Sequence, residues 1–482
     1  MSRGGKLAPL PGPCKAEIPG FLNRAGILPL RSRGSESQSL SVPSDAPSQD
    51  PFRHRNVRLY SWFTVFYSAR AYYPVFTILF LDLGVTLAQF VLLNMIWATV
   101  IVLLEVPSGA MADTIGRRKL VVFASALMVA EMAMLLFAPK DGGWILLAMC
   151  FTNRVLSGAS EAAASGADQA LAFDSLVEHG EEDQWDEVLA RVMRRRSVGF
   201  FIAMTIGALV YDAKFLEWLF STDLDATLVH RLPVALVFAQ SIACLAVALR
   251  MREPKREAAP GATTAELCAS ATRLTLRAAA WVLKTPLAFR IVLGGLLIDS
   301  VVRNLVVVNS EYYRLIALPP VSFGFIGSAV AVIGFFVPAF AKRMTDRFSP
   351  MANLAFMGVM VLLCLVLITP AFTYWGVLPF MLLFTSFGWL EYLSSRTLNR
   401  LATSDQRATV LSVKSLAFNL GYAAASLAYA RLVAWEEGRH DTGGAAFISS
   451  LGWLPLYFVA ALGLFFLFVF ATRKHSRDGE SP

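Results

Sequence analysis

Charged side chains inside long apolar runs are the residues of this chain best placed to do chemistry. Arg70 and Arg154 each lie deep within a mostly apolar run, and Asp299 stands four residues before Arg303 in another. A charge near the centre of a bilayer costs several kcal/mol unless it faces protein or water, so such residues mark binding sites or ion pathways.

Cationic and amide side chains in these runs form the predicted substrate-binding set. Arg70 and Arg154 are expected to bind an anionic or polar group of a substrate, and Arg303 and Asn304 are assigned to the same set. Tyr67 stands three residues before Arg70. An aromatic ring beside a cation favours a flat or anionic ligand, although an aromatic stripe that packs helices together explains it equally well.

Acidic residues in the same runs are the predicted proton-coupling groups: Asp299, Glu161, Glu391 and Glu131. The spacing of Asp299 and Arg303 is that of an ion pair on one helix. Opening of that pair would make the Asp299 carboxylate easier to protonate.

A stripe of charges is predicted on one predicted span. Arg154, Glu161 and Asp168 recur every seven residues, so on one continuous helix they share a face that drifts by about 20° per step. The stripe can face a cavity, or it can be a set of structural ion pairs that holds neighbouring helices together. Both interpretations remain open, and Arg154, near mid-membrane, favours the cavity.

The elements that carry these residues are predicted to be transmembrane helices. The chain has 482 residues, of which 56% are hydrophobic and only 16% are charged, and many apolar runs approach the 20 or so residues that span a bilayer. An all-α polytopic membrane protein is therefore predicted. Its spans are expected at 58–81, 86–111, 118–138, 144–170, 194–212, 232–250, 287–314, 322–341, 351–369, 374–400, 408–433 and 449–472.

The basic residues predict the orientation. Lys and Arg are frequent before residue 58, in the loop from Arg250 to Lys284 and after residue 472, whereas Lys140 is the main cation in the first and third loops. Both termini are therefore expected in the cytoplasm, with the protein in the cell membrane, the inner membrane if it is bacterial. The net charge of +8 lies in loops between spans, which argues against nucleic-acid binding.

Composition also divides the chain into parts. Residues 1–57 are rich in Pro, Ser, Gly and Arg and are predicted to be a disordered cytoplasmic tail; an organelle transit peptide and a wrongly assigned start codon are alternatives. A bundle over 58–250, a cytoplasmic linker over 251–286, a second bundle over 287–472 and a short tail over 473–482 follow. An offset of 233 residues relates Arg70 to Arg303 and Asp113 to Asp346, which indicates an internal repeat.

A short basic hairpin joins the second and third predicted spans. Gly109 and Ala112 are small enough to let two helix backbones approach closely, and Glu105 is expected to be the counter-charge of the basic residues. The hairpin is predicted to lock an inner gate through charge contacts between the bundles. Its residues are Gly109, Asp113, Gly116, Arg117, Arg118 and Lys119.

These hairpin residues resemble the G-x-x-x-D-x-x-G-R-R-K signature of the major facilitator superfamily. The resemblance implies twelve helices in two six-helix bundles, with helices 1, 4, 7 and 10 around a central cavity. The run from Arg154 to Leu176 also resembles a prokaryotic group labelled drug-exporter-like. Gly199 and Gly207 appear without the proline and paired glycine that proton-driven drug antiporters carry in span 5, which weakens that subgroup.

The function expected from this resemblance is secondary transport of a small organic solute by alternating access, as proton antiport in the direction of efflux. Proton-coupled uptake and a transporter-like membrane sensor that moves nothing are the alternatives. The expected partners are the solute, protons and the lipid bilayer, and the chain is expected to be a monomer. The sequence has no phosphate-binding loop, catalytic triad or metal-ligand spacing, so an enzyme, a metal site and a cofactor are not expected.

Overall fold

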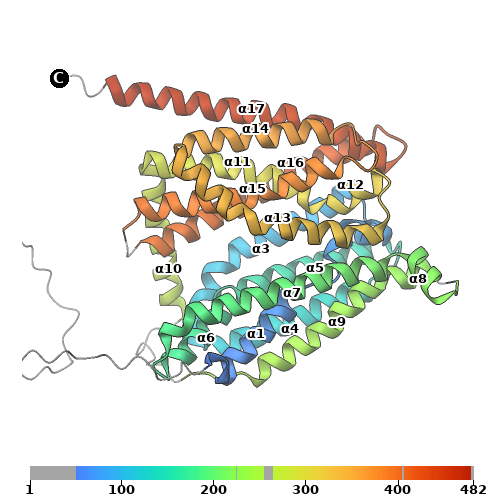
Figure 1. Cartoon of the computed structure of the whole chain (residues 1–482), viewed down its shortest axis with the longest axis horizontal. Helices are drawn as coiled ribbons and strands as arrows, with labels where there is room; N and C mark the ends of the chain where they lie inside the picture. The colour runs from blue at the N-terminus through green and yellow to red at the C-terminus, as the bar shows by residue number, and fades with distance from the viewer. Residues whose placement is uncertain (1–49, 224, 255–263, 404–405, 479–482) are drawn as a thin grey trace, which may run out of the picture. The chain divides into compact units, whose positions relative to one another are not determined.

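The computed structural model describes residues 50–223, 225–254, 264–403 and 406–478, and the regular structure in these residues is entirely helical (Figure 1). The first bundle contains α1 (Arg55–Ser68), α2 (Phe76–Asp82), α3 (Leu87–Thr114), α4 (Arg117–Leu136), α5 (Gly143–Ala164), α6 (Ala167–Val177), α7 (Trp185–Tyr211), α8 (Ala213–Phe220) and α9 (Ala226–Arg250). After α10 (Thr264–Lys284), the second contains α11 (Pro286–Val307), α12 (Asn309–Leu315), α13 (Pro320–Arg347), α14 (Pro350–Ile368), α15 (Val377–Leu401), α16 (Arg407–Glu437) and α17 (Gly443–Asp478).

These helices account for all the predicted spans. Eight of the described helices are long and apolar enough to cross a membrane, and two bent pairs, α7 with α8 and α10 with α11, raise that number to as many as ten. The two remaining spans are broken ones, α1 with α2 and α5 with α6, and both carry charges. The prediction of an all-α membrane protein with two six-span bundles is therefore confirmed.

The start of the first bundle differs from the prediction. The disordered tail was expected to extend to residue 57, but a short 3-10 helix spans Pro51–Arg53 and α1 begins at Arg55. Phe52 is buried, and the guanidinium of Arg195 lies 4.6 Å from the centre of its ring. A buried aromatic ring therefore anchors the chain just before α1. The rest of the predicted tail, residues 1–49, lies outside the described residues.

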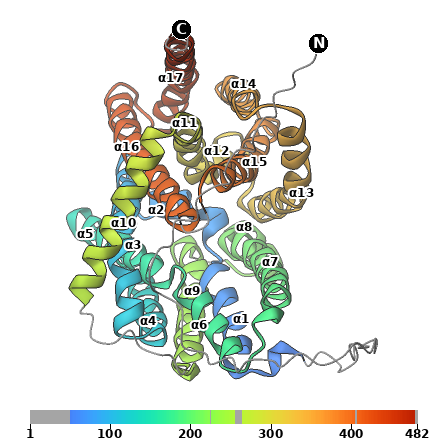
Figure 2. The same ribbon diagram turned by 90° about the vertical axis from the view of Figure 1, so that its left-hand side faces the viewer.

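The most extensive contacts between the bundles are those of α3 with α16 and of α7 with α13 (Figure 2). The crossing of α7 and α13 depends on glycine, because a Cβ added at Gly324 would lie 2.5 Å from the carbonyl oxygen of Met204. Such a close backbone approach between membrane helices requires a residue without a side chain. The linker helix α10 contacts α3 in the first bundle and α11 and α16 in the second.

Candidate functional site

The two ends of the bundles are joined very differently. The end at which α3 meets α4 is here named the hairpin end, and the opposite end, where α2 stops at Asp82, the far end. At the far end Arg314 Nη1 of α12 lies 2.6 Å from Asp82 Oδ1, and the Tyr211 hydroxyl donates to Oδ2 of the same carboxylate at 2.5 Å. The Thr77 amide donates to Ser310 Oγ at 3.0 Å. Polar contacts between the bundles therefore close the far end.

The contact between Thr77 and Ser310 also supports the internal repeat. These residues are 233 positions apart, the same offset that relates Arg70 to Arg303 in the sequence. A residue can touch its own repeat equivalent only near the axis that relates the two repeats. The far-end contact of α2 with α12 therefore lies close to that axis.

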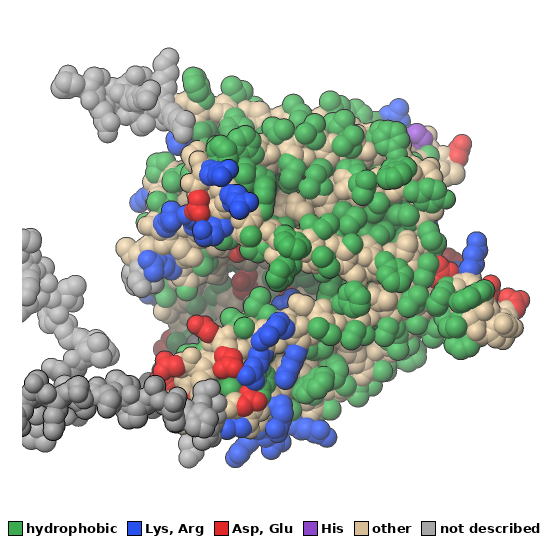
Figure 3. Space-filling model, in the orientation of Figure 1, with side chains coloured by type: hydrophobic (Ala, Val, Ile, Leu, Met, Phe, Trp, Pro, Cys, Tyr) green, Lys and Arg blue, Asp and Glu red, His purple; other side chains and the backbone are tan. Residues whose placement is uncertain are grey.

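The hairpin end is hollowed between the bundles, at the left of Figure 3. Arg117 pairs with Asp174 of α6 and donates to the Ala170 carbonyl at 2.8 Å. Arg118 donates to the carbonyls of Leu249 at 3.0 Å and Met251 at 2.7 Å. Within the described part of the chain, these contacts stay in the first bundle and its exit, so the predicted lock between the bundles is absent from this conformation.

The turn of the hairpin is held by the residues that follow α9. Both carboxylate oxygens of Glu253 accept backbone hydrogen bonds, from Arg117 N at 2.9 Å and from Arg118 N at 2.8 Å. An acid is favoured there because the first amides of α4 have no partner within the helix. Gly116 has a φ of +103°, and a Cβ on it would lie 3.1 Å from the Glu253 carboxylate. Glycine at this position adopts the positive φ without strain and leaves room for the Glu253 carboxylate.

The other residues of the hairpin prediction have different outcomes. Gly109 is exposed, and an added Cβ would meet nothing within 4 Å, so the predicted close helix approach is wrong in this conformation. Glu105 is not the counter-charge, because Asp174 and Glu253 hold that place, and Glu105 Oε2 has no hydrogen-bond partner among the described residues. Lys119 is exposed, and the side chain of Asp113 lies outside the described part of the structure.

A polar cavity of about 450 Å³ lies within the second bundle, between α11, α15 and α16. Arg303 Nη2 lies 2.8 Å from Asp299 Oδ2, and its Nη1 donates to Asn419 Oδ1 at 2.7 Å. On the other wall, Lys414 Nζ lies 2.7 Å from Glu391 Oε2. The cavity therefore brings together two predicted proton-coupling acids and one predicted substrate-binding arginine.

Lys414 is the residue of this cavity that sequence reasoning missed. Its side chain is 8% exposed, whereas that of its partner Glu391 is 63% exposed. A lysine within the predicted span 408–433 was visible in the sequence, and a cation well inside a membrane helix is a signal of function. With Lys414 included, the cavity carries two acids and two bases and is neutral overall.

In the first bundle, Arg70 of the predicted substrate-binding set and Glu131 of the predicted proton-coupling set form one buried ion pair. Arg70 Nη1 lies 2.6 Å from Glu131 Oε1, and the two side chains are 4% and 0% exposed. Arg70 also donates to the Tyr72 hydroxyl at 3.0 Å, and the Tyr67 hydroxyl shares a 2.7 Å hydrogen bond with Ser160. The break between α1 and α2 places Arg70 inside the bundle, and its pair with Glu131 is closed to solvent.

The predicted stripe on the fourth span is interrupted. The helix breaks at Ser165 and Gly166, where Gly166 has a φ of +75°. Asp168 therefore lies on α6, and the prediction that it shares one continuous helix face with Arg154 and Glu161 is wrong. Arg154 is buried and donates to Asn153 Oδ1 at 2.6 Å and 2.8 Å, with its guanidinium 5.2 Å from the centre of the Phe76 ring, whereas Glu161 is exposed.

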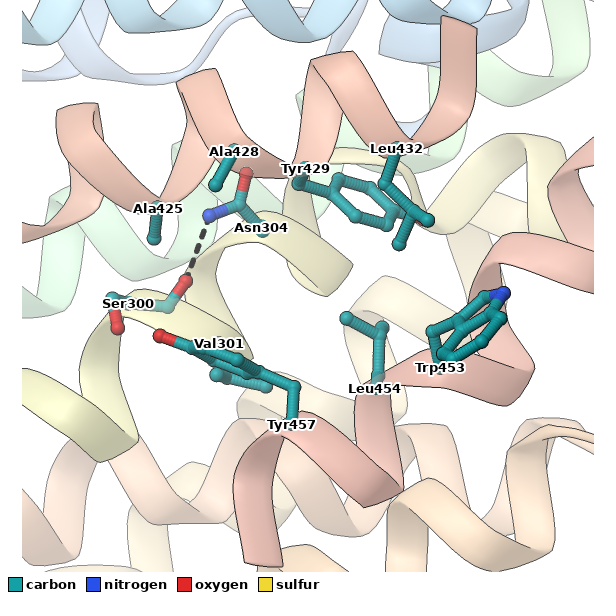
Figure 4. Close-up of a pocket in the computed structure, with 10 residues that line it drawn as sticks. All are labelled: Ser300, Val301, Asn304, Ala425, Ala428, Tyr429, Leu432, Trp453, Leu454 and Tyr457. Carbon is teal, nitrogen blue, oxygen red and sulfur yellow. Dashed lines mark hydrogen bonds between the residues drawn. The ribbon is translucent and has the colours of Figure 1, made fainter. Parts of the chain in front are cut away.

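Asn304 is separated from its neighbour Arg303. Asn304 lines a different cavity, between α11, α16 and α17 (Figure 4), where its amide donates to the Ser300 carbonyl at 2.8 Å. Its side-chain oxygen accepts from Ser426 at 2.9 Å. Adjacent positions on a helix point about 100° apart, so the two residues do not join one binding site as the sequence-based set had implied.

The chain has the same fold as several solved transporter structures. The nucleoside transporter NupG has a TM-score of 0.65 at 13% identity, covering 86% of this chain and 98% of its own. A bacterial homologue of the human lysosomal transporter Spinster, in an inward-facing and occupied conformation, has a TM-score of 0.61 at 16% identity, covering 90% and 99%. A D-xylose-proton symporter has a TM-score of 0.60 at 12% identity, covering 85% and 97%.

The sequence comparisons are informative at the level of the family. A search of curated protein sequences found no match. Residues 60–426 match the family described as Major Facilitator Superfamily. Because that match covers well over half of the 482 residues, this chain belongs to the Major Facilitator Superfamily.

Proposed function

We propose that this protein is a secondary active transporter of a small organic solute that works by alternating access. The observation that carries the proposal is the difference between its two ends, with polar contacts between the bundles at the far end and a hollow at the hairpin end (Figure 3). The membrane spans, the family and the transporter structures that share its fold support the same function.

The hairpin end is the cytoplasmic side in this proposal, because the basic residues of the termini and the linker favour that side. The conformation described above is then the one open to the cytoplasm. The exposed position of Gly109 fits this assignment, since a glycine on α3 is available to pack against the other bundle when the hairpin end closes. The lock formed by Arg117 and Arg118 belongs to that second conformation.

The cavity with Asp299, Arg303, Glu391 and Lys414 is the proposed substrate and coupling site. A polar group of the substrate and a proton compete for the carboxylate of Asp299 or Glu391, so that binding of one releases the other. Exchange of the solute for a proton across the membrane is antiport, and efflux of the solute is the proposed direction. Glu161 supplies an exposed acid from the first bundle.

Proton-coupled uptake is the second candidate, because the same ion pairs serve symport and one similar structure is a D-xylose-proton symporter. A sensor that moves nothing is the third candidate. It predicts that ligands bind but that no solute crosses the membrane, and that the membrane charges are dispensable.

Proton flux in proteoliposomes tests the proposal. Protein would be reconstituted with an imposed pH gradient and exposed to a pooled set of small metabolites and drugs. We expect at least one pool to drive proton movement, in a direction that separates antiport from symport. Asp299→Asn is expected to abolish this movement, because the amide cannot exchange a proton.

The matched control for that variant is Asp346→Asn, which removes an acid of the same type from an exposed ion pair outside the cavity. We expect it to retain most of the proton flux. Ligands that raise the melting temperature without any flux in the wild-type protein would contradict the transporter proposal and support the sensor.

A disulfide across the far end is expected to stop transport. The backbone amide of Thr77 lies 3.0 Å from Ser310 Oγ across the bundles, so Thr77→Cys and Ser310→Cys place two thiols on backbones that approach each other closely, as a disulfide requires. Cys14 and Cys268 would be replaced by serine, and the shift of the cross-linked band and the solute flux would be measured before and after reduction. Full flux in the oxidised form would contradict alternating access at this end.

A further inference from the structure

A second cavity, of about 190 Å³, lies between α11, α16 and α17 and has no residue in common with the charged cavity (Figure 4). Two small residues of α16, Ala425 and Ala428, line it and leave space between the helices. Val301, Leu432 and Leu454 add apolar walls. A cavity of this kind is suited to an apolar chain and has little to offer a polar solute.

The polar groups at the floor of this cavity already have partners. Asn304 donates to the Ser300 carbonyl and accepts from Ser426 Oγ at 2.9 Å, and Ser300 Oγ donates to the Leu297 carbonyl at 3.2 Å. A hydrocarbon can therefore fill the space without leaving these groups unsatisfied.

The cavity opens to the outside of the bundle. Trp453 and Tyr457 of α17 rim it and are 46% and 49% exposed, and Ala428 is exposed as well. The apolar stretch of α17 is the least buried of the candidate spans, at 17%, so this helix faces the bilayer. The compound nearest to the mouth of the cavity is therefore a membrane lipid.

A cation and two indole rings connect the mouth of the cavity to the far end. The guanidinium of Arg439 lies 4.3 Å from the centre of the Trp435 ring, and the rings of Trp435 and Trp453 lie 6.3 Å apart. Arg439 follows the last turn of α16, at the level where lipid headgroups lie, and tryptophan favours that interface. Neighbouring Glu436 accepts from Trp453 Nε1 at 2.9 Å and lies 3.2 Å from His440.

We propose that this cavity is a lipid site, in which a phospholipid of the far-end leaflet inserts one acyl chain between α16 and α17 and places its phosphate against Arg439. The order of the groups along the track, cation, indoles and then apolar cavity, matches the order of phosphate, interface and chain in a phospholipid. A bound chain would support the packing of α17, which is otherwise held on one side only.

Photolabelling of the full-length protein tests this site. The protein would be placed in nanodiscs that contain phosphatidylglycerol with a diazirine on its acyl chain, irradiated, and mapped by peptide mass spectrometry. We expect label in 425–432 and 453–457 at about tenfold the level found in 464–470, a lipid-facing part of α17, which corresponds to about 1.4 kcal/mol of preference. Equal labelling of the pocket and the control segment would overturn the proposal.

Variants separate the cavity from general contact with lipid. Ala428→Trp fills the space and is expected to lower the pocket label to the level of 464–470, and Ala425→Leu, a smaller change, serves if the first variant does not fold. Leu467→Trp, at a position that is 66% exposed on α17, is the matched control and should leave the pocket label unchanged. Arg439→Gln should lower the label in both pocket segments, 425–432 and 453–457, because the lipid phosphate loses its cationic partner. Pocket label that persists in Ala428→Trp and Ala425→Leu would overturn the proposal.

Discussion

Arg70→Met is expected to destabilise the protein by about 3–5 kcal/mol, because it leaves Glu131 as an unpaired charge inside the first bundle. Glu131 is 0% exposed, and its Oε2 already has no hydrogen-bond partner among the described residues. Arg70 therefore supplies the main compensation for the buried carboxylate. Thermal unfolding in detergent would measure the effect as a large drop in melting temperature.

The double variant Arg70→Met with Glu131→Leu separates a structural role from a functional one. Replacing both partners of a buried pair by apolar residues of similar size is often neutral or stabilising, so we expect the melting temperature to recover. Because the pair is closed to solvent, we also expect solute flux to recover in part. A stable double variant without any flux would instead support the roles predicted from the sequence, substrate binding by Arg70 and proton transfer by Glu131.

Lys414→Gln is expected to show the opposite balance, a small loss of stability and a large loss of transport. Its partner Glu391 is 63% exposed, so water can solvate the carboxylate that is left behind, and the stability cost should stay near 1 kcal/mol or below, roughly the range of exposed pairs. The variant changes the cavity from neutral to a net charge of −1, since three of its four charged residues remain. We expect the transport rate to fall at least about tenfold.

Lys342→Gln is the matched control, since it makes the same chemical change in an exposed i,i+4 pair with Asp346 on α13. Melting temperature and solute flux should both stay close to wild type. A large drop in melting temperature in Lys414→Gln, with flux lost only in proportion to the folded fraction, would show that Lys414 acts through stability alone.

The fold could be predicted from the sequence because a bilayer leaves few solutions. A chain that is 56% hydrophobic, with repeated apolar runs, must satisfy its backbone hydrogen bonds within helices. Two of the spans that no single described helix recovers by length and hydropathy, at 58–81 and 144–170, are broken beside Arg70 and at Gly166. The first break precedes Pro74, and the second contains Gly166 with its positive φ. Hydrophobic periodicity reports neither feature.

The sequence also identified Asp299, Arg303 and Glu391 by residue type, since a charge in an apolar run is costly unless it has a partner or water. The sequence could not say which residue each of these charges pairs with. The pairing of Arg70 with Glu131, the place of Lys414 beside Glu391 and the separation of Asn304 from Arg303 all depend on how helices rotate and pack against each other.

The class of this protein, its spans and its short set of costly charges follow from the sequence, because they depend on the free energy of placing each residue in a membrane. Which charges neutralise one another, which face an open cavity and which end of the molecule is closed are properties of the folded chain. Those properties depend on distances between residues far apart in the chain, such as the 232 positions that separate Asp82 from Arg314, and local sequence carries no measure of them.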